Sequence, residues 1–319
     1  MSAAAPLRLL FFGTPEFAVP CLRALQRSRH TVVGVVSQPD RPRGRGRKLV
    51  STPVKAEAEA HALPLLQPEK VGEASALEWM RELAPELGCV VAFGQFIPKL
   101  VRERPPLGLI NAHASLLPRH RGAAPIQHAI LEGDECTGIT VIRVTKEMDA
   151  GDWCLMRETR IGPDETAGEL SARLSELAAE ALLAAVDQMA AGNAHFRPQD
   201  AGGVTLAPKL AKEFGRVHWS EARARLLRRI RAATPWPGAD LRLRKSGARL
   251  RILEAAGVDE LPGRGRPGEV RADAGRLFVA ALDGWVEVLR MQKPGGRPLS
   301  AADYLRGVSV PADEEAAGP

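Results

Sequence analysis

The sequence has few cysteines and no long apolar run. Its four cysteines, Cys21, Cys89, Cys136 and Cys154, form no CxxC pair and have no His at metal-ligand spacing, so we expect reduced, buried thiols and neither disulfides nor a zinc site. No stretch approaches the roughly 20 uncharged apolar residues that span a bilayer. Residues 1–12 carry an early Arg and no small-residue cleavage site. We therefore predict no signal peptide and a reducing, cytoplasmic location.

Charge is distributed unevenly along the 319 residues. The net charge is +6, but residues 201–319 carry 21 Lys and Arg against 14 Asp and Glu, which leaves residues 1–200 at −1. A basic second half fits a polyanionic partner such as nucleic acid, although solubility alone accounts for it equally well. The length favours two domains, and the composition is that of a globular protein.

The first half alternates short apolar runs with helical patterns, as in a doubly wound α/β sheet. We expect strands at 7–12, 31–37, 89–93, 108–112 and 137–144, and helices at 16–27, 54–61, 74–83 and 166–191. The segment 38–51 is rich in Pro and Gly and is expected to be an irregular loop. A polar, Gly-rich stretch at 192–209 predicts a linker between a domain at 1–191 and one at 210–319.

The second half predicts a different architecture. A helix at 220–233 is stopped by Pro235 and Pro237. Short strands then follow at 240–244, 249–255, 268–271, 277–281 and 285–291, separated by Gly and Pro turns, which is typical of a small β-barrel. The acidic tail at 311–319 is expected to be frayed.

Polar residues that are able to carry chemistry lie at two predicted strand ends. Asn111 and His113 lie two residues apart in GLINAHASLLPRHRGAAPIQ, so both face the same side of their strand. Asp149, in KEMDAGD, follows the next strand and is expected at the same edge of the sheet, where ligands of such folds bind. The apolar turn Ser115 to Pro118 suits a flat heterocyclic ligand. From the residues alone, a structural histidine and a turn-forming aspartate remain open alternatives.

The motifs resemble those of the folate-dependent formyltransferases. Asn-x-His-x-Ser-Leu-Leu-Pro with a downstream Asp-x-Gly is specific to that superfamily. Further pieces are similar to its branch that acts on methionyl-tRNA: FFGTPEFAVP at 11–20, SQPDRPRGRGRKL at 37–49, VAFGQFIPK at 91–99, APKLAKEFGRVHWS at 207–220 and TPWPGA at 234–239. The resemblance extends over nearly the whole chain.

The resemblance implies a Rossmann-like first domain, a smaller OB-like barrel and formyl transfer from 10-formyltetrahydrofolate without a metal. It assigns catalysis to Asn111, His113 and Asp149, and tetrahydrofolate binding to Ser115, Leu116, Leu117 and Pro118. An amine that attacks the formyl carbon creates negative charge on the formyl oxygen. Asn111 and a protonated His113 are expected to donate hydrogen bonds to that oxygen, and Asp149 is expected to keep His113 charged and to help move the amine proton.

A cationic segment bears on the identity of the amine. The sequence DRPRGRGRK at 40–48 has a net charge of +4 from Arg41, Arg43, Arg45, Arg47 and Lys48. Alone it is equally a solvated loop; the resemblance implies that it contacts the acceptor stem of a tRNA. We therefore expect the α-amino group of methionine on initiator tRNA as the acceptor, with about half of the arginines of the helix at 222–233 contacting RNA and the others serving as solvated charge. The protein is expected to be a monomer without membrane contact.

Two other functions compete with this interpretation. One is a formyltransferase for a nucleotide sugar or for glycinamide ribonucleotide, which needs neither the cationic loop nor a basic second domain. The other is a non-catalytic RNA-binding module, against which the intact catalytic and folate motifs argue. Gly13 to Pro15 lacks the GxGxxG pattern of dinucleotide sites and is expected to be a structural turn.

Overall fold

The computed structural model describes residues 5–43, 48–259, 265–311 and 313–317. The chain divides into two compact units. The first comprises Met1–Pro125, Cys136–Arg160 and Ser171–Pro208, and the second comprises Ile126–Glu135, Ile161–Leu170 and Lys209–Pro319.

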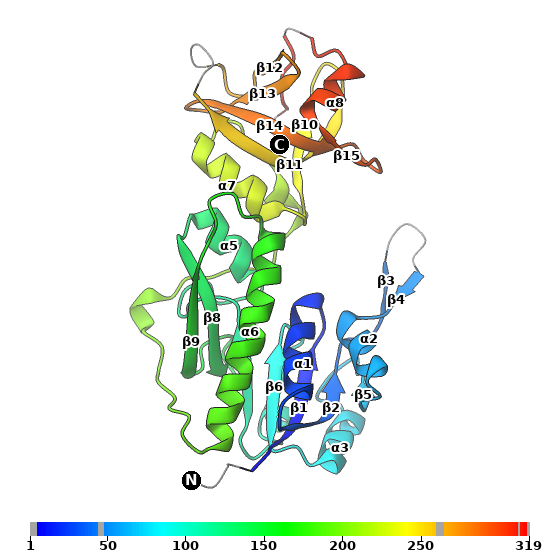
Figure 1. Ribbon diagram of the computed structural model, residues 1–319, viewed down its shortest axis with the longest axis vertical. Coiled ribbons are helices and arrows are strands. Elements are labelled where there is room, and N and C mark those ends of the chain that lie inside the picture. The colour runs from blue at the N-terminus through cyan, green and yellow to red at the C-terminus, as the bar shows by residue number, and fades with distance from the viewer. Residues whose placement is uncertain (1–4, 44–47, 260–264, 312, 318–319) are drawn as a thin grey trace. The chain divides into compact units, whose positions relative to one another are not determined.

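The first unit is built on a seven-stranded sheet in the order β5-β2-β1-β6-β7-β8-β9 (Figure 1). The strands up to residue 208 are β1 Arg8–Gly13, β2 Thr31–Val36, β3 Arg41–Arg43, β4 Lys48–Val50, β5 Leu65–Leu66, β6 Leu87–Val91, β7 Leu109–His113, β8 Cys136–Arg143 and β9 Trp153–Arg160. The helices up to residue 208 are η1 Glu16–Ala18, α1 Val19–Gln26, α2 Pro53–Ala60, α3 Ala74–Leu83, α4 Lys99–Arg102, α5 Pro125–Glu132, α6 Ala167–Ala190 and η2 Ala201–Gly203. Residues 126–132 of α5 and 167–170 of α6 belong to the second unit.

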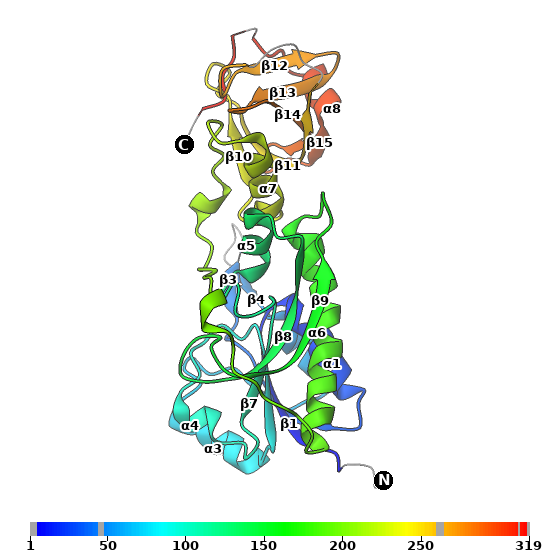
Figure 2. The ribbon, with the colours of Figure 1, turned by 90° about the vertical axis from the view of Figure 1, so that its left-hand side faces the viewer.

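Helices cover both faces of this sheet. Figure 2 shows α1 and α6 on one side of the sheet and α3 and α4 on the other. Strand alternation sends Leu10 and Phe12 of β1 into a cluster with Met80 of α3 and Val101 of α4. The five strands β5, β2, β1, β6 and β7 run parallel, and their continuous apolar runs reflect burial on both faces. The predicted doubly wound α/β fold is confirmed.

The direction of β8 differs from the prediction. Strand β8 pairs antiparallel with β7, with Ile110 opposite Arg143 and His113 opposite Thr140. The carboxyl end of β8 therefore lies beside the beginning of β7, at the opposite edge from His113. Our expectation that the end of β8 itself delivers Asp149 to the edge of the sheet at His113 is wrong, although Asp149 does lie beside His113. The loop after β8 brings it there instead.

The segment 38–51 is also more regular than predicted. Strands β3 and β4 pair antiparallel, with Arg41 opposite Val50 and Arg43 opposite Lys48. The expectation of a wholly irregular loop is therefore wrong at both ends of this segment. Pro42 is tolerated because the pair is an isolated two-stranded ribbon, in which a missing N–H does not interrupt a larger sheet.

The second unit contains an antiparallel sheet in the order β10-β11-β14-β13-β12, with β15 added to β14. Its strands are β10 Ala239–Arg242, β11 Arg249–Val258, β12 Val270–Asp273, β13 Arg276–Ala280, β14 Trp285–Gln292 and β15 Pro298–Ser300. Its helices beyond residue 208 are η3 Lys212–Gly215, α7 Arg223–Ala233 and α8 Ala301–Arg306. The predicted small β domain is confirmed.

The C-terminal tail joins the two edges of this sheet. Ala316 forms a bridge with Leu243, next to β10, and Glu315 forms one with Glu269, next to β12. Ala316 is buried. The tail between 313 and 317 therefore closes the sheet into a barrel, and the expectation of a frayed tail is wrong for these residues.

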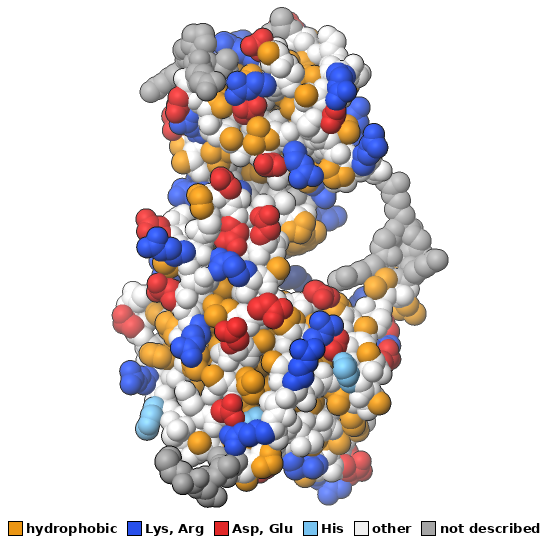
Figure 3. Space-filling view, in the orientation of Figure 1, with side chains coloured by type: hydrophobic (Ala, Val, Ile, Leu, Met, Phe, Trp, Pro, Cys, Tyr) orange, Lys and Arg blue, Asp and Glu red, His pale blue; other side chains and the backbone are white. Residues whose placement is uncertain are grey.

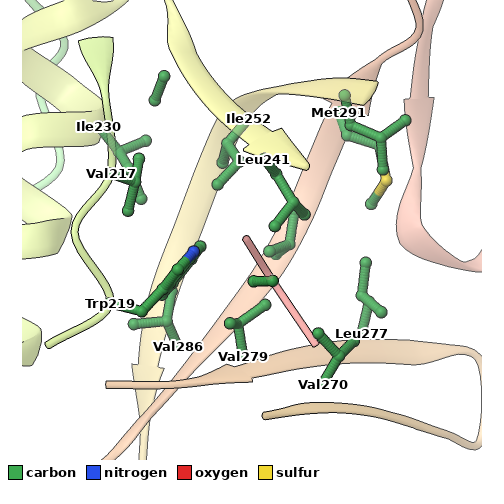
Figure 4. Packing of buried hydrophobic residues seen from close by; sticks show 14 of the residues in the cluster. Val217, Trp219, Ile230, Leu241, Ile252, Val270, Leu277, Val279, Val286 and Met291 are labelled. Carbon is green, nitrogen blue, oxygen red and sulfur yellow. The ribbon is translucent and has the colours of Figure 1, made fainter. Parts of the chain in front are cut away.

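A single apolar cluster fills the barrel. In Figure 4, Leu241 and Ile252 from the first two strands point toward Val279 and Val286, and Trp219 stacks beside them. Ile230 of α7 contributes to the same cluster. Alternating inward residues on β10 and β11 produce this pattern, because every second side chain faces the core.

Candidate active site

Strand β7 presents the two polar residues of the site on one face. Asn111, opposite Val90 of β6 and Ile142 of β8, is half-buried, and His113 at the strand end is buried. The strand lies between two neighbours, so its backbone is fixed on both sides. This rigid position suits residues whose geometry must be maintained.

Two oxygen atoms flank the ring of His113. Its Nε2 lies 3.0 Å from the carbonyl oxygen of His120, and its Nδ1 lies 3.6 Å from Oδ2 of Asp149. The same Asp149 oxygen accepts a hydrogen bond of 2.9 Å from the Gly122 N–H. The structure thus brings His113 and Asp149 together at ion-pair distance, with both side chains nearly buried.

The residues that present these oxygens have unusual backbone conformations. His120 and Asp149 have φ of 60° and 50°, left-handed values that are uncommon for residues other than Gly. Gly122 has φ of 128°, and a Cβ on it would lie 2.4 Å from the carbonyl oxygen of Ala207. Strain of this kind clusters at functional sites, where the surrounding structure maintains it.

The predicted folate motif is a rigid turn with only part of its surface open. Ser115 is fully buried, donating through Oγ to the Arg119 carbonyl at 2.6 Å, and Leu117 is buried too. Oγ1 of Thr140, on β8, accepts from the Leu117 N–H and donates to the Ser115 carbonyl. Leu116 and Pro118 remain partly exposed. Ser115 and Leu117 thus shape the turn, and Leu116 and Pro118 are the side chains open to a ligand.

The turn after β1 forms hydrogen bonds with the loops that follow two neighbouring strands. Thr14 donates through Oγ1 to the Phe93 carbonyl at 2.9 Å and accepts from the Gln38 N–H. The amide of Gln38 also donates to that carbonyl. Thr14 therefore ties together the loops that follow β1, β2 and β6, which agrees with the predicted structural turn.

The predicted linker runs along the segment that follows the folate motif. The Arg121 N–H donates to the Thr205 carbonyl, and the Ala207 N–H donates to the Arg121 carbonyl, at 2.9 and 2.7 Å. The Ala124 N–H donates to the Ala207 carbonyl. Residues 205–207 are thus hydrogen-bonded to the segment 121–124 beside the site, which the polar, Gly-rich composition of 192–209 did not predict.

The cationic hairpin is anchored at its base. Lys55 Nζ donates to Asp40 Oδ2 at 2.6 Å, and the Gln67 amide donates to Asp40 Oδ1 at 2.9 Å. These bonds, that of Gln67 first and then that of Lys55, hold the pKa of Asp40 below its usual range. At the surface, Arg41 pairs with Glu69. The backbones of Arg43 and Lys48 belong to β3 and β4, and Arg45 and Arg47 lie outside the described residues.

The cysteines do not form part of the site. Cys21 and Cys89 are fully buried, and this burial raises the pKa of both thiols. Burial also raises the pKa of the half-buried Cys154, to about 11. Within the described residues no group of three or more His, Cys, Asp or Glu is arranged to hold a metal ion. No helix in the described parts of the chain is long and apolar enough to span a bilayer.

Most arginines of α7 are engaged within the second unit. Arg223 donates to Asp259 and to the Val258 carbonyl, and Arg229 is nearly buried against Glu221. Burial lowers the pKa of the Arg231 guanidinium. The structure thus gives Arg223 and Arg229 structural partners and leaves Arg231 partly buried.

A basic concavity lies on the outer face of β10 and β11. Arg242 lies directly opposite Arg249 in the sheet register, and Arg251 lies opposite Asp240. Together with Lys293 these exposed side chains line a depression of about 440 Å³. Like charges on opposed sheet positions repel each other, so this arrangement favours an anionic ligand. On the face drawn in Figure 3, basic and acidic side chains are otherwise interspersed.

Comparisons with known proteins identify the family of this chain. The formyl transferase family model matches residues 7–186, and the model of its C-terminal domain matches residues 209–309. A relative from Syntrophus aciditrophicus named methionyl-tRNA formyltransferase is 43% identical over 306 residues, which cover 95% of this chain and 96% of the relative.

Solved structures share the fold at lower identity. An N-formyltransferase from Helicobacter canadensis in complex with folinic acid and dTDP-3-aminofucose is 15% identical, with a TM-score of 0.67, covering 88% of this chain and 98% of that one. HypX from Aquifex aeolicus in complex with tetrahydrofolic acid is 21% identical, with a TM-score of 0.64, covering 94% of this chain and 47% of that one. The chain belongs to the formyl transferase family.

Proposed function

We propose that the protein transfers the formyl group of 10-formyltetrahydrofolate to the α-amino group of methionine on charged initiator tRNA. The observation that carries this proposal is the His113–Asp149 pair of 3.6 Å beside Asn111, in a chain that matches relatives of this activity over 95% of its length. The rigid turn beside them, with Leu116 and Pro118 open, fits a flat folate ring.

The residues divide the chemistry between them. When bound, the folate supplies the formyl carbon that the amine attacks. Asn111, half-buried on β7, donates a hydrogen bond to the formyl oxygen as that oxygen gains negative charge; one such donor is worth about 100- to 1000-fold in rate. His113 adds positive charge beside Asn111. Its Nε2 faces the His120 carbonyl at 3.0 Å, so His113 acts on the formyl oxygen through its charge while that contact holds the ring in place.

Asp149 acts with His113 as the acid–base pair that takes the proton from the amine and returns it to the leaving nitrogen. A separation of 3.6 Å between Nδ1 and Oδ2 is longer than a hydrogen bond. Catalytic contacts of this kind commonly tighten only once substrate is bound. The nearly buried setting strengthens the electrostatic attraction, because water screens the charges less there.

Two basic elements are proposed to hold the tRNA. The first is the hairpin bearing Arg41, Arg43, Arg45, Arg47 and Lys48, whose guanidinium groups pair with phosphates and stack on unpaired bases near the acceptor end. The second is the concavity of Arg242, Arg249, Arg251 and Lys293. It replaces α7 as our preferred RNA contact in the second domain, because Arg223, Arg225 and Arg229 of α7 form ion pairs within that domain.

The same reasoning extends to organisation and location. We propose a catalytic domain at 1–191, a linker at 192–209 and a tRNA-binding domain at 210–319, which the separate family matches at 7–186 and 209–309 support. We also propose that Ser115, Leu116, Leu117 and Pro118 form the folate subsite. The protein is proposed to work as a monomer in the cytoplasm, where its substrate tRNA is charged.

The decisive experiment offers alternative acceptors to the purified protein. With 10-formyltetrahydrofolate present, we expect formylation of charged initiator methionyl-tRNA and none of glycinamide ribonucleotide or a dTDP-amino sugar. Mass spectrometry of the released amino acid identifies the product. Formylation of a small acceptor, with the tRNA left unmodified, would overturn the proposed acceptor while leaving the formyl transfer intact.

A further inference from the structure

The two acceptors around His113 both come from strained residues. The His120 carbonyl faces Nε2 and the Asp149 carboxylate faces Nδ1, and both residues have positive φ. A left-handed conformation in a residue other than Gly costs free energy, and it persists only where neighbouring groups hold it. The groups that hold these two residues therefore determine where the ring of His113 lies.

Gln199 holds Asp149 through its backbone. The Gln199 amide nitrogen donates to the carbonyl oxygens of Asp149 and Gly151, each at 2.8 Å. Its amide oxygen accepts from Arg121, at 2.7 Å from Nη2 and 3.1 Å from Nε. One side chain thus joins the Asp149 loop to the residue that follows His120.

Thr205 holds His120 in the same way. The His120 N–H donates to Thr205 Oγ1 at 2.8 Å, and the Arg121 N–H donates to the Thr205 carbonyl. Both supports come from the segment 197–207. Paired main-chain bonds attach this segment at Arg197, which bonds reciprocally with Trp153, and at Ala207. The supporting side chains are therefore held at both ends.

The structure assigns Gln199 and Thr205 as positioning residues that fix both hydrogen-bond acceptors of His113. This role rests on the proposed function of His113 and Asp149. Neither side chain contacts the His113 ring: each acts through the backbone of the residue that does. A loss of either support frees a strained backbone to relax and moves one acceptor away from the ring, and a misplacement of about 1 Å costs on the order of 100-fold in rate.

Gln199→Ala and Thr205→Val test this assignment in the full-length protein. We expect kcat for formylation of charged initiator tRNA to fall on the order of 100-fold in each variant, with the KM for folate and for tRNA changed less than threefold. The pH dependence of kcat is expected to shift as well, since the environment of His113 changes. Thr205→Ser, which keeps the Oγ acceptor, is expected to restore most of kcat.

The matched control is Gln188→Ala, which removes a partly buried glutamine of α6 and is expected to leave kcat and the pH profile unchanged. Thermal melting confirms that each variant is folded; if Gln199→Ala does not fold, the Thr205→Val and Thr205→Ser pair decides. Unchanged kcat and pH profile in folded Gln199→Ala or Thr205→Val, or equal kcat in Thr205→Val and Thr205→Ser, overturns the positioning role. A wild-type protein that formylates no tRNA instead contradicts the proposed function.

Discussion

At the scale of single residues, a conservative replacement of Asp149 tests the role of its negative charge. Asp149→Asn keeps an oxygen for the Gly122 N–H, which lies 2.9 Å from Oδ2, but removes the charge 3.6 Å from His113. We expect kcat to fall about 100- to 10000-fold, because a proton acceptor and the partner of the imidazolium are both lost. Steady-state formylation of charged initiator tRNA measures this effect.

The control for that variant is Asp152→Asn, which alters an exposed carboxylate in the same loop and is expected to leave kcat within a few-fold of wild type. Both variants should melt within a few degrees of the wild type, since each replacement preserves shape. A folded Asp149→Asn protein with nearly normal kcat would rule out the acid–base role.

The residues of the site differ in how far the sequence predicted them. The spacing of Asn111 and His113 on one strand face was sufficient to group them, and the motif added Asp149. Gln199 and Thr205 were not predicted, because a side chain that bonds to the backbone of a residue 50 or more positions away leaves no local pattern. The need for glycine at position 122 was not predictable either, because it comes from the close approach of the Ala207 backbone.

At the scale of elements, the β3–β4 hairpin has two properties that separate variants can test: the charge of its arginines and the position that its anchored base gives it. Arg45→Ala removes a proposed phosphate contact, so tRNA binding should weaken and its salt dependence should fall by about one counterion.

Lys55→Met breaks the 2.6 Å bond to Asp40. It should weaken tRNA binding a few-fold by displacing the hairpin, with the salt dependence unchanged.

Titrations of tRNA binding at several salt concentrations distinguish the two variants, with the KM for folate as the internal control. Because the pKa of Asp40 is lowered in the folded protein, this anchor is fully present above the pKa of the unfolded chain and is lost as pH falls through the lower folded value. An unchanged tRNA affinity in Arg45→Ala would contradict the proposed role of the hairpin.

Element type was more predictable than element direction. The strands with continuous apolar runs and the helix Ala74–Leu83 were predicted within a few residues. The antiparallel direction of β8 was not, since a buried strand has the same composition in either direction. The Pro and Gly content of residues 38–51 predicts a loop, but the two short strands β3 and β4 form there because they pair with each other.

At the scale of the whole molecule, the sequence predicted neither where the basic residues of the second half gather nor how its barrel closes. The basic excess of residues 201–319 could be counted from the sequence, but its location could not be predicted. Arg223, Arg225 and Arg229 of α7 form ion pairs, and the cations exposed on β10 and β11 are brought together only by sheet register. Barrel closure by the tail was likewise hidden, because the tail is short and polar and bridges residues more than 40 positions away.

The tail is held by the carboxylate of Glu314 as well as by its backbone. Glu314 is buried and accepts from the N–H groups of Lys245 and Ser246 at 2.7 and 2.9 Å. Burial alone raises the pKa of this carboxyl, but the hydrogen bonds from Lys245, Ser246 and Glu315 outweigh that effect, so the pKa in the folded protein is lowered. The stabilisation by this carboxylate is therefore present above the unfolded pKa of about 4.3 and is lost as pH falls through the folded value.

Glu314→Gln tests the closure of the barrel. At neutral pH we expect a loss of about 1–3 kcal/mol in the free energy of unfolding, because two buried N–H groups exchange a charged acceptor for a neutral one. At pH 3 the difference from wild type should shrink, since this pH lies below the unfolded pKa and the stabilisation by the carboxylate is then being lost. Glu315→Gln, at a half-exposed neighbour, should show neither effect. Calorimetry of all three proteins at both pH values measures this, and a difference of equal size at the two pH values would show that the charge of Glu314 does not hold the tail.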